Sequence, residues 1–261
     1  MKFSKKSLGQ NFLIERNVIK KILGLKNFKN RNIIEIGPGR GALTDEILKK
    51  NPKSLTVIEK DYELTKNLKA KYSKNKLIKI INADILNFNL EKIKKKKLII
   101  IGNLPYNISS QILIKIIKEK NINNRFEDLI FMFQKELGER IIGKFPSKHY
   151  GRLSIIVKFK LQILKYFLVS ANCFIPKPKV TSMVIHFKVF DNIQYKIKNI
   201  SNLEKITNIL FSNKRKMINK NIKKILNEDQ IKKVSDLNVR SRAENIDPKT
   251  FYKITEIFEA K

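Results

Sequence analysis

Apolar runs that alternate with longer amphipathic stretches constrain the fold of this chain more than any other feature. The first five runs, in chain order, are RNIIEIG (31–37), SLTVIE (54–59), KLIKII (76–81), LIII (98–101) and DLIFMF (128–133). Between these runs, helical patterning and suitable first residues predict helices over 41–51, 61–72 and 109–120. Strand–helix alternation of this kind predicts an α/β fold in which helices wrap a mostly parallel sheet.

The last two apolar runs and the segment after them depart from this alternation. LSIIVKF (153–159) and MVIHFKV (183–189) predict strands, and the connection 160–182 has little helical periodicity. The two strands are expected to pair antiparallel at one edge of a seven-stranded sheet. Beyond about Phe190 the strand signals fade and amphipathic helices follow, the last of them starting at Asp247–Pro248. We predict an α/β domain over 1–190 and a small α-helical domain over 191–261.

The charge of the chain favours a polyanionic partner. Lys and Arg number 56 against 23 Asp and Glu, which gives a formal net charge of +33. A surface of this kind attracts RNA, DNA or an anionic membrane. Lys, Ile and Asn have AT-rich codons, so genome composition accounts for part of the charge. It favours a nucleic-acid partner without naming one. The Lys94–Lys97 run is expected to be a solvated face before the LIII strand.

Composition also bounds the location of the protein and its metal chemistry. No apolar run approaches the roughly 20 residues of a membrane span, and the basic first residues lack the apolar core of a secretory signal. Cys173 is the only cysteine, so no internal disulfide is expected, which fits a reducing cytoplasm. With that cysteine and only His149 and His186, no zinc site or other metal is expected.

The segment EIGPGRGALT (35–44) joins the first predicted strand to the first of these helices through a glycine-rich turn. Gly37, Gly39 and Gly41 would let the backbone approach a ligand that a side chain would block. The phosphate-loop pattern GxxxxGK[ST] is absent. A dinucleotide and S-adenosylmethionine both remain open as cofactors, and a helix-start turn without a ligand is the alternative.

Polar residues follow three further predicted strands, at the edge where ligands bind in open α/β sheets. Glu59 ends the second strand and can accept both hydroxyls of a ribose, which NAD and S-adenosylmethionine share. Asp84 follows the third strand and can accept from an adenine amine, although Asn82–Ala83–Asp84 is also a plausible turn. Asn103 follows the fourth strand and should face the same crevice.

The stretch IGNLPYNISS (101–110) is the most specific motif of the chain. The Asn103 side-chain oxygen and the Leu104 carbonyl, which Pro105 turns inward, can accept from the two hydrogens of an exocyclic amine. Tyr106 can stack on the ring that carries this amine. Two acceptors would localise the nitrogen lone pair, and a sulfonium methyl is already activated. Neither a metal nor a dedicated general base is then required.

Taken together, these segments resemble the small-subunit ribosomal RNA adenine N6,N6-dimethyltransferases. The resemblance covers nearly the whole chain and rests on LGQNFL (8–13), EIGPGRGALT (35–44), VIEKD (57–61), NADIL (82–86), NLPYNIS (103–109), FQKE (133–136), YGRLS (150–154), FIPKPKV (174–180) with Ser182, and FSNKRKM (211–217). It implies a Rossmann-like class I methyltransferase domain and a helical C-terminal domain. It also implies a cytoplasmic enzyme, expected to be a monomer, that uses S-adenosylmethionine to dimethylate two adjacent adenines. These lie in the 3′-terminal hairpin loop of small-subunit (16S) rRNA, within a pre-assembled subunit.

The resemblance also implies roles for individual residues. The implied cofactor contacts are Asn11, Leu13, Gly37, Gly39, Glu59, Asp84 and Asn103. The target base would meet Asn103, Leu104, Pro105 and Tyr106, with Phe174 as a second stacking ring. Lys214, Arg215 and Lys216 resemble the family's RNA-contacting helix. The family often has two arginines there, and lysine keeps the charge while losing bidentate binding of phosphate.

Three alternatives stay open beside this interpretation. An antibiotic-resistance methyltransferase of large-subunit rRNA shares the glycine loop and a similar Asn–Pro turn, but YGRLS and FSNKRKM argue against it. A non-catalytic assembly or transcription factor on the same fold would not need Asn103, Tyr106 and Glu59, which are all present. An NAD oxidoreductase shares the loop and Glu59 and has no use for the NLPY motif.

Overall fold

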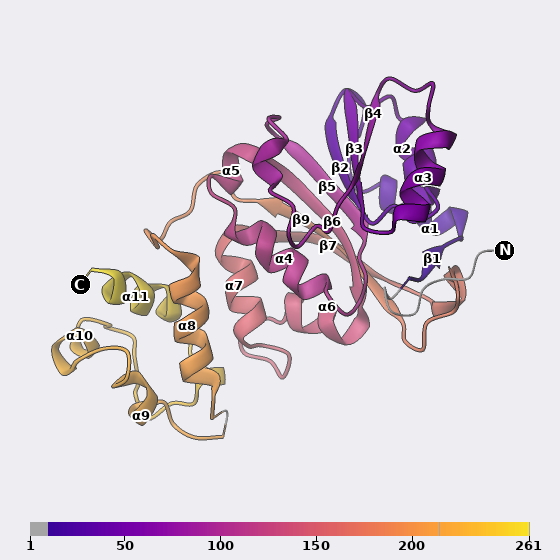
Figure 1. The fold of residues 1–261 in the computed structure, drawn as a ribbon. Coiled ribbons are helices and arrows are strands. Elements are labelled where there is room, and N and C mark those ends of the chain that lie inside the picture. Colours follow the sequence, from indigo (N-terminus) through magenta and orange to yellow (C-terminus); the bar gives the residue numbers. More distant parts are fainter. Residues whose placement is uncertain (1–9, 214, 261) are drawn as a thin grey trace. The chain divides into compact units, whose positions relative to one another are not determined.

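The computed structural model describes residues 10–213 and 215–260 and divides the chain into two compact units (Figure 1). Residues up to 138 together with 162–191 form the first unit, and residues 139–161 together with those from 192 onward form the second. Where the sequence predicts domains of 1–190 and 191–261, the second unit also takes in a segment from the middle of the chain. The chain passes from the first unit to the second within α6 (Lys135–Ile142).

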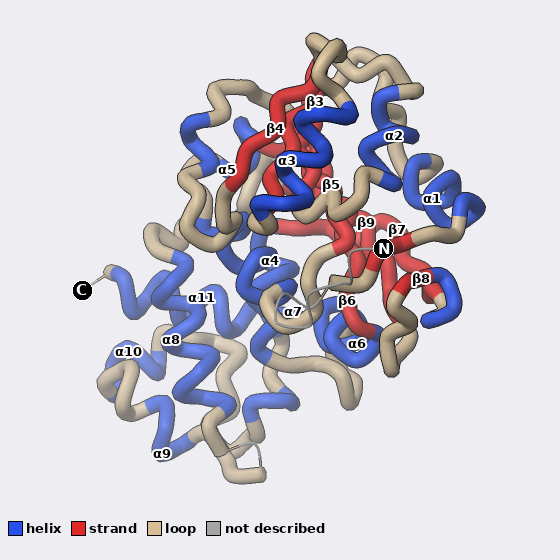
Figure 2. The backbone as a smooth tube through the Cα atoms, turned by 45° about the vertical axis from the view of Figure 1, so that its right-hand side comes forward, coloured by secondary structure: helices blue, strands red, loops and turns tan. Residues whose placement is uncertain are grey.

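A seven-stranded sheet organises the first unit (Figures 1 and 2). In spatial order its strands are β4 (Ile78–Asn82), β3 (Ser54–Glu59), β2 (Asn32–Ile36), β5 (Leu98–Asn103), β6 (Phe126–Gln134), β9 (Ser182–Val189) and β7 (Leu161–Val169). From β4 to β6 all neighbouring strands pair in parallel, and β9 pairs antiparallel with β6. The predicted mostly parallel seven-stranded sheet with an antiparallel edge is therefore confirmed.

The helices predicted between the parallel strands are present with shorter bounds. The helices of this unit are α1 (Arg16–Leu23), α2 (Ala42–Leu48), α3 (Tyr62–Lys71), α4 (Ser109–Lys118) and α5 (Ile122–Arg125). Asp61 caps α3 because its carboxylate accepts from the backbone N–H groups of Glu63 and Leu64. Helices α1 to α3 lie on one side of the sheet, and α4 and α5 on the other (Figure 1).

One predicted strand is wrong, and its true counterpart lies in the segment expected to be a connection. LSIIVKF forms the helix α7 (Arg152–Lys160), while β7 occupies the first part of 160–182. The Ser154 hydroxyl closes the first turn of α7, since it donates to the Gly151 carbonyl at 2.8 Å and accepts from the Gly151 N–H at 3.1 Å. Five of the nine residues of α7 are buried, so it lacks the polar face that marks a helix in sequence.

The second unit is helical. Besides α7 it contains α8 (Ile200–Phe211), α9 (Asn219–Ile222), α10 (Glu228–Lys232) and α11 (Pro248–Glu259). Asp247 caps α11 and Pro248 is its first residue, as predicted. The segment 139–161 is tied into this unit by two buried phenols: the Tyr150 hydroxyl donates to the Ile246 carbonyl and the Tyr252 hydroxyl to the Ile155 carbonyl.

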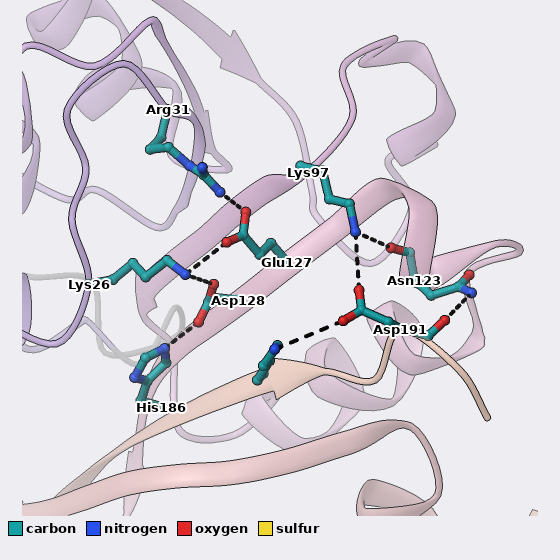
Figure 3. A network of polar contacts seen from close by, with 9 residues as sticks. Lys26, Arg31, Lys97, Asn123, Glu127, Asp128, His186 and Asp191 are labelled. Carbon is teal, nitrogen blue, oxygen red and sulfur yellow. Dashed lines mark hydrogen bonds and ion pairs between the residues drawn. The ribbon is translucent and has the colours of Figure 1, made fainter. Parts of the chain in front are cut away.

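A network of ion pairs joins the start of β6 to the chain that follows α1 (Figure 3). Asp128 is 1% exposed and accepts from His186 of β9 at 2.6 Å and from Lys26 at 2.7 Å. Its neighbour Glu127 pairs with Lys26 and Arg31. This network lies where the parallel strands begin, at the end of the sheet opposite to their carboxyl ends. Within residues 10–213 and 215–260, no helix is long and apolar enough to cross a membrane.

Candidate active site

A cavity of about 410 Å³ lies at the carboxyl ends of β2, β3 and β5. This volume falls in the range typical of small-molecule pockets. Ten of the residues implicated by the sequence line it: Asn11, Leu13, Gly37, Gly39, Glu59, Asp84, Asn103, Leu104, Pro105 and Tyr106. The structure thus gathers residues from five separate segments at the sheet edge where ligands bind in open α/β folds.

The glycine-rich loop requires glycine at three positions, of which Gly37 and Gly39 line the cavity. Gly37, Gly39 and Gly41 have φ angles of +66°, +58° and +86°. A Cβ atom on Gly39 would lie 2.8 Å from the Phe12 ring, which stacks beneath the Arg40 guanidinium at 4.7 Å. The short β1 strand (Phe12–Leu13), paired with β8 (Phe174–Ile175), therefore packs directly against the loop. Only a residue without a side chain allows this approach.

Glu59 ends β3 inside the cavity and is 7% exposed. One carboxylate oxygen accepts from the Gly39 N–H at 3.2 Å and the other from the Asp61 N–H at 2.9 Å. Burial, above all, raises the pKa of Glu59, although these two backbone hydrogen bonds act to lower it. Each oxygen keeps a further lone pair, so the side chain can accept two more hydroxyls.

Asp84 lies in the turn after β4 and is ionised. Its Oδ2 atom is 2.9 Å from the Lys60 Nζ atom, and its Oδ1 atom accepts from the Leu86 N–H. The ammonium of Lys60 lowers the pKa of Asp84 below its ordinary value. A carboxylate at this place, 21% exposed, can accept a hydrogen bond from an amine that enters the cavity.

Asn103 connects the end of β5 to the N-terminal segment. Its Nδ2 atom donates to the Asn11 carbonyl at 2.8 Å, which leaves the side-chain oxygen as an acceptor for a ligand. Tyr106 is held from the other side, because its hydroxyl lies 2.5 Å from the Ser182 Oγ atom of β9. Burial raises the pKa of Tyr106, so its phenol stays neutral. The motif thus presents an amide oxygen and a fixed aromatic ring to the same cavity.

Three of the predicted residues that the structure describes do not line this cavity. Phe174 is 2% exposed, pairs with Leu13 and packs within the core of the first unit. Its proposed stacking on a target base would require the ring to leave this packing. Arg215 and Lys216 are exposed in the turn after α8 ends at Phe211, so the expected helix around them is corrected to a turn. Lys214 lies outside the described residues.

Glu35 was missed by the sequence analysis although it belongs to the glycine-rich motif. It lines the cavity from inside β2, is 1% exposed, and accepts from the Thr44 hydroxyl at 2.7 Å. Burial, above all, raises the pKa of Glu35 to about 8. The available signal was a single acid in the otherwise apolar run IIEI. In the part of the chain that the structure describes, no group of three or more His, Cys, Asp or Glu is placed to hold a metal ion.

Comparison with known proteins places the chain in a family. The family model "Ribosomal RNA adenine dimethylase" matches residues 1–260. The chain is 43% identical over 257 residues to a protein of Pelagibacter ubique named ribosomal RNA small subunit methyltransferase A, covering 98% of this chain and 97% of that one. Its namesake in Malacoplasma penetrans is 38% identical over 260 residues, with coverages of 97% and 91%.

Two solved structures have the same fold. A dimethyladenosine transferase from Plasmodium falciparum superposes with a TM-score of 0.76 at 23% identity, covering 93% of this chain and 95% of that one. The 23S rRNA methyltransferase ErmE gives a TM-score of 0.73 at 20% identity, with coverages of 95% and 100%. These two likenesses establish a Rossmann-like methyltransferase fold. The family model that matches residues 1–260 and the relative that is 43% identical over 98% of this chain show that the chain belongs to the ribosomal RNA adenine dimethylase family.

Proposed function

We propose that this protein transfers methyl groups from S-adenosylmethionine to N6 of two adjacent adenines in the 3′-terminal hairpin loop of small-subunit rRNA. The observation that carries the proposal is the meeting of the Asn103 amide oxygen and Tyr106 with Glu59 and Asp84 in one cavity. The names of the relatives support small-subunit rRNA as the substrate. The fold alone does not separate this activity from that of the large-subunit enzyme.

The residues of the cavity fit the cofactor. Glycines without side chains at 37 and 39 leave room for its amino-acid end, and Glu59 has acceptor capacity for the ribose hydroxyls. Asp84 offers a carboxylate for the adenine amine. When bound, S-adenosylmethionine supplies a methyl group already activated by its sulfonium centre. The chain therefore needs to supply positioning and an activated acceptor nitrogen.

The NLPY motif supplies that activation. The Asn103 side-chain oxygen and the Leu104 carbonyl accept the two N6 hydrogens, which localises the nitrogen lone pair and aims it at the methyl carbon. The Tyr106 ring stacks on the adenine, and its bond to Ser182 fixes the angle of that surface. Orientation of this kind can contribute about 7–11 kcal/mol to rate acceleration. The proton of the methylated amine leaves to solvent after transfer.

The first test is radiolabelled methyl transfer from S-adenosylmethionine. The acceptors are small ribosomal subunits that lack N6-dimethyladenine, intact large subunits, and naked rRNA, each with the wild-type protein and Asn103→Ala. Label on small-subunit adenines alone, lost in the variant, is the expected result. Label on large subunits would favour the resistance-type activity. Tight small-subunit binding without any label would favour a non-catalytic assembly factor. We further propose that the protein acts as a cytoplasmic monomer on the assembled subunit.

A further inference from the structure

The strand β7 forms one edge of the seven-stranded sheet and has an exposed apolar face (Figure 1). Leu164, Tyr166 and Leu168 are 42%, 54% and 52% exposed. Side chains two residues apart on a strand are neighbours on one face, so these three form a single apolar strip, the β7 strip. On the opposite face, Phe167 and Val169 pack against the core of the first unit. An exposed apolar strip beside a packed face indicates an interaction site.

The backbone along the outer edge of β7 is open for pairing as well. β7 is the last strand of the sheet, next to β9. In the described part of the chain, residues 162–168 make no backbone hydrogen bond besides those of the sheet itself. Every second residue of an edge strand directs its N–H and C=O groups away from the sheet, where another strand can pair with them. The β7 edge therefore offers a template for the addition of a strand.

The edge strand on the other side of the sheet is protected against such pairing. β4 has five residues where β7 has nine. The exposed residues of β4 are Lys79 and Asn82, whereas Ile78 and Ile80 pack against the core. A short edge strand that exposes polar side chains resists pairing with other chains. β7 is long and exposes apolar side chains, so the same protection does not operate there.

Charge distinguishes between the occupants that could cover β7. Residues 140–190, which include β7 and β9, contain ten Lys and Arg and no Asp or Glu. Lys165 at the centre of β7 is exposed and has no ion pair within the described chain. If β7 paired along its full length with β7 of a second copy, Lys165 would lie opposite Lys165. Like charges directly opposite each other are destabilising, and opposite charges are stabilising.

We propose that β7 binds an extended segment of an acidic protein partner, which adds to the sheet as a further strand. The partner's backbone pairs with the outer edge of β7, and an Asp or Glu of the partner lies opposite Lys165. Apolar residues on both sides of that acid cover the β7 strip, which favours β-branched or aromatic residues there. RNA would also match the charge of Lys165, but open backbone groups and a single exposed ring fit a peptide strand better.

This inference is independent of the proposed function, because no residue of β7 lines the cavity. The test uses two nine-residue peptides with blocked ends, TVTVEVTVT and TVTVKVTVT, which match the length of β7. Antiparallel pairing along β7 places the central residue opposite Lys165 and four valines on the face of the β7 strip. Each peptide is titrated into the full-length ¹⁵N-labelled protein. We expect the glutamate peptide to bind about tenfold more tightly than the lysine peptide and to shift the amide signals of residues 162–168.

Two modified peptides test the pairing of the backbone. Both have the sequence TVTVEVTVT, one with N-methyl groups on its valines and the other with N-methyl groups on the remaining residues. Only one of these two sets of N–H groups can point toward β7 in an added strand. One modified peptide should therefore keep its affinity within about threefold, and the other should no longer bind. Equal affinities of the two would overturn strand addition.

Three variants test the roles of Lys165 and the β7 strip. Lys165→Glu should reverse the preference, so that the lysine peptide binds about tenfold more tightly than the glutamate peptide. Lys79→Glu makes the same change of charge on β4, at another exposed residue of an edge strand, and should change neither affinity more than twofold. The double variant Leu164→Lys with Leu168→Lys should abolish binding of both peptides. Circular dichroism checks the fold, and if the double variant fails to fold, the two single charge reversals decide.

Four other outcomes would overturn the inference. The first is that neither peptide binds. In the second, Lys79→Glu weakens binding of the glutamate peptide as much as Lys165→Glu, which would mean that only the total charge acts. In the third, the wild type dimerises in sedimentation and the double variant does not, so that a second copy is the occupant. In the fourth, a single-stranded RNA of nine nucleotides shifts the signals of residues 162–168 and the peptides do not.

Discussion

The nitrogen and the oxygen of the Asn103 side-chain amide have different roles. The nitrogen holds the N-terminal segment through the Asn11 carbonyl, and we propose that the oxygen accepts from the target amine. We expect Asn103→Ala to lower methyl transfer at least 100-fold, by analogy with the loss of a single hydrogen bond in other active sites. Binding to small subunits should change less than twofold. Radiolabel incorporation and filter binding on the same preparations measure both quantities.

Asn103→Asp separates the two tasks of this side chain. It keeps an acceptor oxygen and loses the N–H donor, so we expect more residual activity than in Asn103→Ala. If the Asp variant were as inactive as the Ala variant, the link to Asn11 would be the function of Asn103, and the acceptor role would be refuted.

Gly39 is required by both its backbone conformation and its neighbour. Gly39→Ala should lower stability by about 1–3 kcal/mol, since φ is +58° and the new Cβ atom would lie 2.8 Å from the Phe12 ring. In a Phe12→Ala background only the cost of the φ angle should remain. Urea unfolding of the two single variants and the double variant measures the coupling. Purely additive effects would show that the ring adapts without cost and that contact with Phe12 is irrelevant.

The sequence could place three of the proposed site residues at one edge of the sheet because each lies where a strand ends. Glu59, Asp84 and Asn103 were found at strand ends, and parallel strands bring their carboxyl ends to one edge. Glu35 and Phe174 depend on contacts that are distant in the chain. The burial of Glu35 comes from α2, β3 and the end of α3, and Phe174 is placed by pairing of β8 with β1. No local pattern encodes either arrangement.

Among the helices and strands, the errors have the same origin. A short apolar run with β-branched residues fits a buried strand and a buried helix equally, and α7 is such a helix. Apolar and polar residues do not alternate along β7, because Leu164, Tyr166 and Leu168 on the exposed side of this edge strand are apolar too. The two-residue period of a strand was therefore not visible in the sequence. The turn after Phe211 interrupts a stretch that is amphipathic throughout. Tertiary packing determines whether these segments are helix or strand, whereas the helix caps Asp61 and Asp247 could be predicted from the local sequence.

The Asp128 network provides a prediction about the stability of β6 and β9 (Figure 3). Burial alone would raise the pKa of Asp128. The His186 ring and the Lys26 ammonium nevertheless hold this pKa below its ordinary value of 3.8. The ionised Asp128 therefore makes its full contribution to the free energy of unfolding above pH 3.8. This contribution is lost as the pH falls through the lower pKa that Asp128 has in the folded state. Asp128→Asn should cost about 3–5 kcal/mol at pH 7, as for other broken buried pairs.

Urea unfolding at pH 7 and at progressively lower pH below 4 measures this dependence. The difference between wild type and Asp128→Asn should shrink as Asp128 becomes protonated in the folded protein. Lys188→Ala is a suitable control, because its pairing with Asp191 at 3.9 Å lies on the surface and should contribute less than about 1 kcal/mol. A difference that stays constant down to pH 2 would refute the assignment of this stabilisation to the charge of Asp128.

The two compact units both carry part of a large positive charge, so charge alone does not say which surface binds RNA. A net charge of +33 supports binding to any polyanion, with an affinity that falls steeply with salt. A dedicated contact has to be distinguished from this general attraction. The exposed Arg215 and Lys216 in the turn after α8, together with Lys214, are proposed as such a contact.

Two triple variants with equal loss of charge make this distinction. One replaces Lys214, Arg215 and Lys216 by Ala, and the other replaces Lys94, Lys95 and Lys96, which are exposed in the first unit. If the turn contacts phosphates, the first variant should bind small subunits more weakly and reduce the slope of log K against log salt by about 1 for each lost contact. The second should change both quantities much less. Binding measured from 50 to 300 mM KCl, a range set by the expected salt sensitivity, compares the slopes. Equal losses in the two variants would mean that the total charge acts and that the turn is no specific RNA contact. A loss confined to the first variant would assign recognition of the ribosomal particle to the helical unit, separately from the chemistry at Asn103.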